Sequence, residues 1–362
     1  MKHISLSGAG PLVQQRRSLK TSVPTVLGLL LAIVVVWASP AASSVSASRE
    51  LSGPQLAAAK QCPWPACSKV IAAVSAGTRV KQLPGNLSPS LESASKDLLP
   101  PKGFLGCVVN QTGVSTPFPC VINPTATDKR MALIGDSHAE MWSSPLAQVA
   151  KADGYSLLFL AKIPCPLPMV PFWNVLNNTP DTQCTTWKKW ATAKIQQFDP
   201  SVVVATTEDL NPYTNNALAM SQKTFSSGLV TTLKGLAAPG RRVILLGDIP
   251  YLSRSGPVCL AAHESSVSSC ATPVSQAVNK QKQAAEQSAA AKAGATFVDV
   301  IPWFCTTKSC PATIDNLDVY SDGEHITATY GDSLADVLTQ SLGLGPAASG
   351  VTTTTAAVSP TT

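Results

Sequence analysis

The chain has 362 residues, of which 44% are hydrophobic and 13% are charged. This composition can bury a substantial core, and the length suits one large domain with appendages. The formal net charge is +6, but Lys2, Arg16, Arg17 and Lys20 lie in residues 1–47, which contain no acid. The rest of the chain is nearly balanced and has no basic patch of the kind that binds nucleic acid, so no nucleic-acid partner is expected.

Residues 1–47 have the composition of an export signal. A basic start precedes an apolar run over 23–38, and the small-x-small sequence at 45–47 is typical of a cleavage site. The run has about 16 residues, fewer than the ~20 that span a bilayer comfortably. An uncleaved helix that anchors the chain is the alternative. We therefore expect an exported protein, either secreted or held at the outer face of the cytoplasmic membrane.

Ten cysteines indicate an oxidising compartment. They lie in loop-like stretches without a CxxC pair, which favours disulfides over the alternative, zinc sites with Cys and His ligands. Pairing between sequence neighbours is the simplest connectivity because each bond closes a short loop, although the sequence alone does not prove it. The pairs are then Cys62–Cys67, Cys107–Cys120, Cys165–Cys184, Cys259–Cys270 and Cys305–Cys310.

Both flanks of the chain look irregular. Residues 48–128 begin as a small-residue linker and continue as a Pro-, Gly- and Ser-rich extension that contains disulfide cysteines, one helix pattern over 66–76 and little strand pattern. Residues 345–362 contain no charged or aromatic residue. Such a tail buries too little apolar surface to offset its chain entropy, so we predict that it is disordered.

Residues 129–344 alternate short apolar runs with helical patterns. The runs typical of buried strands cover 131–134, 156–160, 201–205, 242–246 and 296–300. The helical patterns cover 139–153, 184–198, 215–237, 273–294 and 329–342. This alternation predicts an α/β protein, a three-layer α/β/α sandwich with a mainly parallel, flavodoxin-like sheet. Ligands bind beyond the carboxyl ends of such strands, so the loops that follow them are the expected place for chemistry.

Ser137 stands directly after the first predicted strand, within the segment GDSH at 135–138. A hydroxyl there would lie near a helix start, whose backbone N–H groups can stabilise an oxyanion. A serine nucleophile also needs an imidazole base that a carboxylate orients. His325 follows the last predicted strand, and Asp322 precedes it by three residues, so one tight turn can hold both. We therefore expect Ser137, His325 and Asp322 to meet at one edge of the sheet.

Two segments resemble the first and last motif blocks of the SGNH (GDSL-like) hydrolases, LIGDSHAEMW around Ser137 and YSDGEHIT around His325. A Cys-Pro pair at 165–166 and the closing pair Cys305–Cys310 bring the resemblance nearer to SGNH domains associated with bacterial acyltransferase-3 membrane proteins. The resemblance covers roughly residues 85–342. It implies the SGNH hydrolase fold, with Ser137 as nucleophile, His325 as base and Asp322 as orienting acid.

The oxyanion hole is the incomplete part of this pattern. Many SGNH esterases draw donors from a glycine after the second strand and from a G-x-N-D block after the third, and this chain has neither. The Ser137 N–H would be one donor, Asn211 is a candidate for the second, and Asp136 and His138 are candidate oxyanion or substrate contacts. Losing one donor can cost ~10²–10³ in rate, so a slow enzyme is compatible with the sequence.

Nearby acids and histidines have other interpretations. The Asp-Ser-His string also resembles the opening of metallophosphoesterases, but those sites need more histidines than the four in this chain. Glu208 and Asp209 follow the third predicted strand, and nothing further supports a paired-carboxylate glycosidase. We interpret Asp248, after the fourth strand, as a turn residue. No metal or organic cofactor is predicted.

The predicted chemistry is double displacement on an acyl ester. The family resemblance implies acetyl groups on cell-envelope glycans or glycolipids. Esterases and O-acyltransferases share these residues, so hydrolysis and transfer both stay open, and transfer would need a separate membrane acyltransferase partner. The alternative from a different class is a non-catalytic carbohydrate-binding or scaffold protein that retains the fold.

Overall fold

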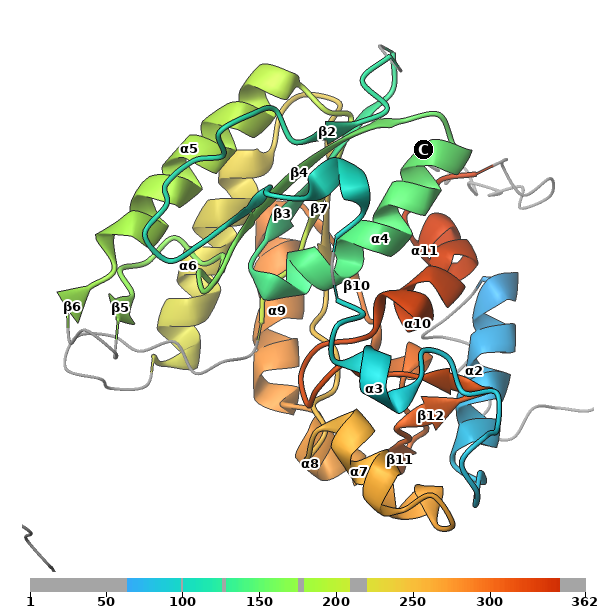
Figure 1. Cartoon of the computed structure of the whole chain (residues 1–362). Coiled ribbons are helices and arrows are strands. Elements are labelled where there is room, and N and C mark those ends of the chain that lie inside the picture. The colour runs from blue at the N-terminus through green and yellow to red at the C-terminus, as the bar shows by residue number, and fades with distance from the viewer. Residues whose placement is uncertain (1–63, 99, 126–127, 175–178, 209–219, 346–362) are drawn as a thin grey trace, which may run out of the picture. The chain divides into compact units, whose positions relative to one another are not determined.

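Five parallel strands form the centre of the protein, which the computed structural model describes over residues 64–98, 100–125, 128–174, 179–208 and 220–345. In chain order they are β3 (Arg130–Gly135), β4 (Ser156–Lys162), β7 (Val202–Ala205), β8 (Arg242–Leu246) and β10 (Thr296–Val298). Their spatial order is β4-β3-β7-β8-β10 (Figure 1). This is the 2-1-3-4-5 order of flavodoxin-like sheets, whose ligand site lies between the first and third strands.

The strands are apolar on both faces because both faces are covered. Along β3, Met131 and Leu133 belong to one core cluster, whereas Ala132 and Ile134 belong to another. Successive side chains of a strand point to opposite faces, so these two clusters lie on opposite sides of the sheet. The predicted three-layer α/β/α architecture with a mainly parallel sheet is therefore confirmed.

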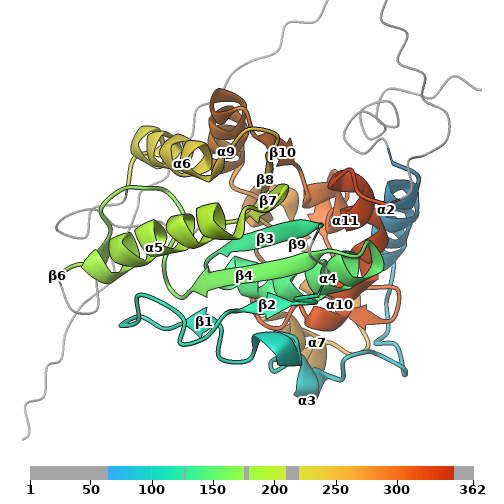
Figure 2. The same cartoon turned by 90° about the horizontal axis from the view of Figure 1, so that it is seen from above.

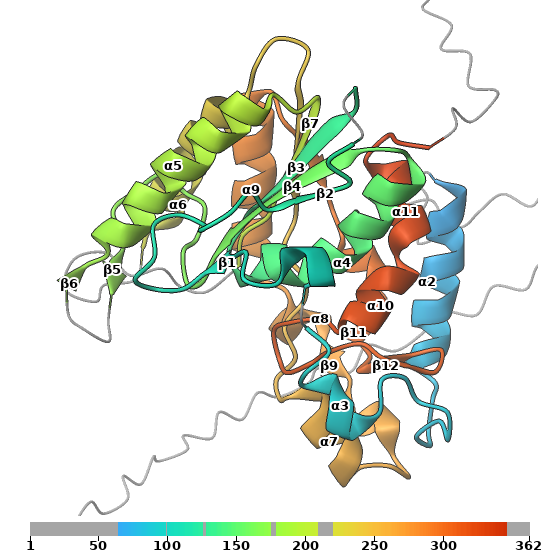
Figure 3. The same ribbon diagram turned by 45° about the horizontal axis from the view of Figure 1, so that its top comes forward.

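Two sets of helices make the outer layers. Figure 2 shows α5 (Thr182–Phe198), α6 (Gln222–Leu236) and α9 (Lys280–Ala293) along one face of the sheet. The other face carries α4 (Ser137–Ala152), α10 (Ala328–Ser333) and α11 (Ala335–Ser341). Outside them, α2 (Pro65–Gly77) lies beside α11 (Figure 3), where the Ala66 N–H donates to Gln340 Oε1 at 3.1 Å.

The N-terminal extension contributes to the sheet, a feature that its composition does not reveal. The strands β1 (Val108–Val109), which is parallel, and β2 (Val121–Ile122), which is antiparallel, both pair with β4. Each has two residues, too few to show alternation in the sequence. The extension also contains α3 (Leu91–Ala94) and the 3₁₀ helix η1 (Lys102–Phe104).

Two predicted helices are divided in the structure. The pattern over 273–294 becomes α8 (Val274–Ala277) and α9, because the Asn279 side chain caps α9 by accepting from the Lys282 N–H at 3.1 Å. The pattern over 329–342 becomes α10 and α11, which meet at Leu334. The small elements that complete the described chain are β5 (Trp173–Asn174), β6 (Thr179–Pro180), α7 (Gly256–Ala262), η3 (Val267–Cys270), β9 (Thr272–Pro273), η4 (Ile301–Trp303), β11 (Ser309–Cys310), β12 (Thr313–Ile314) and β13 (Leu317–Asp318).

Disulfides join cysteines that are neighbours in sequence. The bonds are Cys107–Cys120, Cys165–Cys184, Cys259–Cys270 and Cys305–Cys310. Each is a pair that the sequence analysis predicts. Cys67 is also disulfide-bonded, and its predicted partner Cys62 lies outside the described residues.

The predicted export signal or anchor (1–47) and the C-terminal tail from residue 346 onward lie outside the described residues. Among the helices that the structure does describe, none combines the length and the apolar character that crossing a membrane requires.

Gly135 ends β3 where the backbone of the next strand comes very close. A Cβ at this position would lie 2.4 Å from the Thr206 carbonyl oxygen and 2.9 Å from the Ala139 Cβ. Thr206 directly follows β7 and Ala139 lies in α4, so the backbone itself would have to move to make room. The glycine of the GDSH segment is therefore required by packing.

We predict that Gly135→Ala lowers the free energy of unfolding by about 1–3 kcal/mol, the usual cost of overpacking a well-packed interior. Urea denaturation measures the change. Gly85→Ala is the matched control, because a Cβ at Gly85 would meet no atom within 4 Å. Equal effects of the two substitutions would contradict the packing argument.

Candidate active site

Ser137 is the first residue of α4, immediately beyond the carboxyl end of β3. The strand order reverses here, because β3 lies between β4 and β7. Its backbone N–H is one of the N-terminal donors that an α-helix cannot satisfy internally. The Ser137 residue is 6% exposed, so the hydroxyl is nearly buried at the point where a ligand of this fold would bind.

Asp136 caps α4 and joins the ends of two strands. Its Oδ1 accepts from the His138 N–H at 3.0 Å. Its Oδ2 accepts from the Thr207 hydroxyl and from the Glu208 N–H, both at 2.9 Å. Burial raises the pKa of Asp136, although the cationic His138 and these hydrogen bonds act in the opposite direction. The carboxyl therefore holds the loop after β3 against the loop after β7.

Glu208 contacts the predicted nucleophile. The Ser137 hydroxyl donates to Glu208 Oε2 at 3.3 Å, and the Glu208 residue is only 4% exposed. Burial raises the pKa of Glu208, the negative charge of Asp136 raises it further, and the net value is about 8. The carboxyl is therefore largely protonated near neutral pH.

Asp322 and His325 share one tight turn, as predicted. Asp322 Oδ1 accepts from the N–H groups of Glu324 and His325 at 2.7 and 2.8 Å. Asp322 Oδ2 lies 2.8 Å from His325 Nδ1. Burial acts to raise the pKa of Asp322, but the hydrogen bond from His325 and these N–H donors lower it below its usual value. An ionised Asp322 holds a proton on Nδ1 and leaves Nε2 available as a base.

The two loops meet at the start of α4. The ring of His325 lies edge-on to that of His138, with 5.3 Å between centroids. His325 Nε2 is buried and has no hydrogen-bond partner, while the Ser137 hydroxyl is directed to Glu208. The predicted Asp322–His325 pair is thus formed, and the Ser137–His325 hydrogen bond is not. Catalytic hydrogen bonds are often long or misaligned without substrate.

A second Asp–His pair lies behind the first. His138 Nδ1 lies 2.6 Å from Asp248 Oδ1, and Asp248 Oδ2 accepts from the Lys282 ammonium at 3.1 Å and the Tyr251 hydroxyl at 3.0 Å. Burial alone would lower the pKa of His138, but Asp248 raises it to about 9. The pKa of Asp248 is lowered by Lys282 and His138 despite its burial. Asp248 is therefore a buried anion between two cations, and its interpretation as a turn residue is incomplete.

Asn211, the predicted second oxyanion donor, lies outside the described residues. Asp136 and His138, the other candidate oxyanion or substrate contacts, are fully buried. The carboxylate of Asp136 is occupied by its three donors, whereas His138 keeps Nε2 without a partner. Among the described residues, two groups at the Ser137 hydroxyl could stabilise an oxyanion: the Ser137 N–H and the carboxyl of Glu208, which lies 3.3 Å from Oγ.

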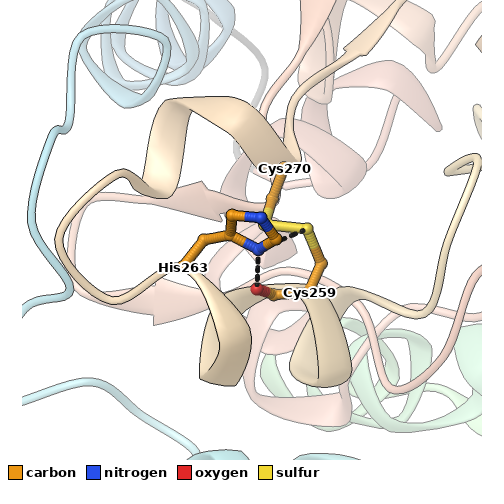
Figure 4. Close-up of side chains that lie close together, drawn as sticks. All are labelled: Cys259, His263 and Cys270. Carbon is orange, nitrogen blue, oxygen red and sulfur yellow. Dashed lines mark hydrogen bonds between the residues drawn. A yellow bond between two sulfur atoms is a disulfide. The ribbon is translucent and has the colours of Figure 1, made fainter.

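Cys259, His263 and Cys270 lie close enough together to suggest a metal site (Figure 4). The two sulfur atoms are joined in a disulfide, so neither is a thiolate ligand. His263 Nδ1 lies 2.9 Å from the Cys259 carbonyl oxygen. This cluster is a disulfide with a histidine packed against it.

The sequence matches the family described as SGNH domain (fused to AT3 domains) over residues 106–350. The chain belongs to this family. The match begins at Gly106, so the family domain includes β1 and β2 of the extension together with the parallel sheet. SGNH family members are esterases or acyltransferases.

Comparison with curated proteins gives no match. Among solved structures, the lipopolysaccharide acetyltransferase periplasmic domain of Salmonella ser. Paratyphi A is similar at 17% identity and a TM-score of 0.49, covering 70% of this chain and 97% of that one. A GDSL-like lipase from Bacteroides thetaiotaomicron is similar at 13% identity and a TM-score of 0.37, covering 61% and 91%.

The buried charges give a first test of the site. We predict that Asp248→Asn lowers the free energy of unfolding by about 3–5 kcal/mol, because it removes the carboxylate that pairs with His138 and one of the carboxylates that pair with Lys282. Asp199→Asn is the matched control. Its side chain is 73% exposed and pairs with Arg241 at 3.0 Å, and surface pairs contribute less than about 1 kcal/mol. Similar losses in the two variants would contradict the assignment.

The pKa shifts of Glu208 and His138 also predict how stability depends on pH. Both folded-state pKa values, about 8 and about 9, exceed the usual values of 4.5 and 6.5. The folded state therefore binds more protons, and the free energy of unfolding should fall as pH rises from 6.5 through 9. Urea denaturation at several pH values in that range measures the free energy of unfolding. Greater stability at pH 9 than at pH 6.5 would contradict the prediction.

Proposed function

We propose that this chain is an exported serine esterase or O-acyltransferase that acts on acyl groups, most simply acetyl, of cell-envelope glycans or glycolipids. The observation that carries the proposal is the Asp322–His325 pair, held in one turn beside the start of the helix that begins with Ser137. Family membership supports the same chemistry.

In the first half-reaction, Ser137 Oγ forms a bond to the carbonyl carbon of the ester. His325 Nε2 takes the hydroxyl proton, and ionised Asp322 stabilises the imidazolium that forms. Collapse of the tetrahedral intermediate breaks the bond to the leaving alkoxide, which receives the proton from His325. The products of this half-reaction are an acyl-Ser137 ester and a free alcohol.

In the second half-reaction, an acceptor hydroxyl attacks the acyl-serine while His325 removes its proton. Water as the acceptor completes hydrolysis, and a glycan hydroxyl completes transfer. In both cases the proton returns to Ser137 Oγ as the acyl bond breaks. Because the protein groups are the same, the acceptor that reaches the site determines the reaction.

A polar surface pocket supports a hydrophilic substrate. It has a volume of about 510 Å³ and is lined by Tyr251 and residues 275–281. The pocket is not lined by Ser137, Asp322 or His325, and Tyr251, whose ring centroid lies 5.9 Å from that of the buried His138, is the lining residue that approaches the site. Hydroxyl, amide and ammonium groups of this lining suit the hydroxyl groups of a sugar.

The family description, with its fusion to AT3 domains, supports a membrane acyltransferase as the partner. In transfer, that partner would supply the acyl group and this domain would pass it to the acceptor. The export signal or anchor predicted over residues 1–47 would place the domain on the same side of the membrane as envelope glycans.

We predict that Ser137→Ala abolishes turnover of a chromogenic acetyl ester by the oxidised full-length chain. Asp322→Asn should reduce kcat/KM on the order of 10⁴-fold, because the amide no longer holds the imidazole in the required tautomer. His263→Gln is the control, since this histidine lies against the Cys259–Cys270 disulfide, and it should keep full activity. Turnover that survives unchanged in Ser137→Ala would refute the mechanism.

Adding an acetylated envelope glycan or a glycan acceptor to the same assay distinguishes the two reactions. Mass spectrometry of the glycan should show acetyl groups gained on transfer or lost on hydrolysis, and both changes should require Ser137. Binding of the glycan without any change in acetylation would favour the non-catalytic alternative.

A further inference from the structure

Glu208 is the acidic residue that accepts a hydrogen bond from the predicted nucleophile, and the triad leaves it without a role. It follows β7 at the carboxyl edge of the sheet, and its N–H donates to Asp136 at 2.9 Å. Its Oε2 lies 3.3 Å from Ser137 Oγ. The loop after β7, the third of the parallel strands in chain order, therefore places a buried carboxyl in contact with the reacting oxygen.

We propose that Glu208 is a further catalytic residue, and that its carboxylic acid form donates a hydrogen bond to the oxyanion formed when Ser137 attacks the ester. The inference rests on the proposed esterase or acyltransferase function. The oxyanion is bonded to the same carbon as Ser137 Oγ, so a donor that contacts Oγ can also reach it. The Ser137 N–H and the Glu208 O–H would then provide donors from two adjacent loops.

The surroundings of Glu208 favour its neutral form. The negative charges of Asp136 and of Asp248, which follows β8, raise the pKa of Glu208. The positive charge of His138, at the start of α4, lowers it. The Lys282 ammonium on α9 is engaged with Asp248 and with the Thr207 carbonyl oxygen at 3.3 Å. With burial the largest effect, the pKa of Glu208 reaches about 8. A buried carboxylic acid kept neutral in this way can serve as an oxyanion donor.

Each proton in this step has a donor and an acceptor. In the resting site, the Ser137 hydroxyl donates to Glu208 Oε2. During attack this proton moves to His325 Nε2, and the carboxyl proton of Glu208 turns toward the carbonyl oxygen, which becomes the oxyanion. Glu208 keeps its proton throughout. An ionised Glu208 would lack the donor and would place a second negative charge beside the oxyanion, so activity should fall as Glu208 ionises.

The test compares glutamine with alanine at this position. Hydrolysis of a chromogenic acetyl ester is measured from pH 5.5 to 9.5 with the oxidised full-length chain, and Ser137→Ala provides the background rate. We expect Glu208→Ala to lose ~10²–10³ in kcat/KM, the usual effect of removing an oxyanion donor. Glu208→Gln, which keeps a donor but does not ionise, should stay within about tenfold of wild type at pH 7.

The pH profile separates a catalytic role from a structural one. Wild-type kcat/KM should decline above about pH 8, following the pKa of Glu208, and Glu208→Gln should lack this decline. Glu264→Gln changes an exposed glutamate distant in sequence from Glu208, and it should keep the wild-type dependence of kcat/KM on pH. Circular dichroism and thermal unfolding of each variant confirm that it is folded.

Two results would overturn the proposal. If folded Glu208→Gln is as inactive as Glu208→Ala while Glu208→Asp retains activity, the carboxylate acts as a base. If the alkaline decline persists in Glu208→Gln, another group causes it. Absence of Ser137-dependent turnover in the wild-type chain would overturn the proposed function as well, so the two failures are distinguishable.

Discussion

The carboxylate of Asp136 is the interaction on which the rest of the site depends. It accepts one hydrogen bond from the start of α4 and two from the loop after β7, and all three donors are buried. Because the bonds cross from one strand end to the next, they fix Ser137 and Glu208 relative to each other. Gly135 makes this possible, since only a residue without Cβ lets the two backbones approach so closely. Asp136 of the GDSH segment thus joins the ends of two strands, and its nearly buried neighbour Ser137 is the reactive group.

The layers and the five parallel strands follow from features that the sequence carries locally. Buried strands appear as continuous apolar runs, and each of the five predicted runs overlaps a strand of the central sheet. The pairing of β1 and β2 with β4 could not be predicted, because a two-residue strand has no period and gains its geometry from the edge on which it lies. The breaks at Asn279 and Leu334 were hidden because both lie inside helical patterns that continue on the far side of the break.

The candidate site was predictable where function depends on residues near in sequence and hidden where it depends on tertiary contacts. Asp322 and His325 share one turn, so their pairing follows from spacing. Asp248 is 110 residues from His138, and no local pattern links them. A signal did exist, since Asp248 and Glu208 each follow a strand at the carboxyl edge of the sheet, where ligands of this fold bind. The sequence could not show the tertiary contacts with Lys282 and His138 that keep Asp248 ionised, or the burial that keeps Glu208 protonated.

The central claim is that Ser137 is a nucleophile in a site held by these buried carboxyls. Its most direct test is to mix the oxidised full-length chain with an acetyl ester, quench it in acid within the first turnover, and analyse its peptides by mass spectrometry. We predict one acetyl group on the peptide that contains Ser137, increased in amount when the acceptor is omitted and absent from Ser137→Ala. Turnover that leaves Ser137 unmodified at every quench time, with the acetyl group on another residue, would contradict the account.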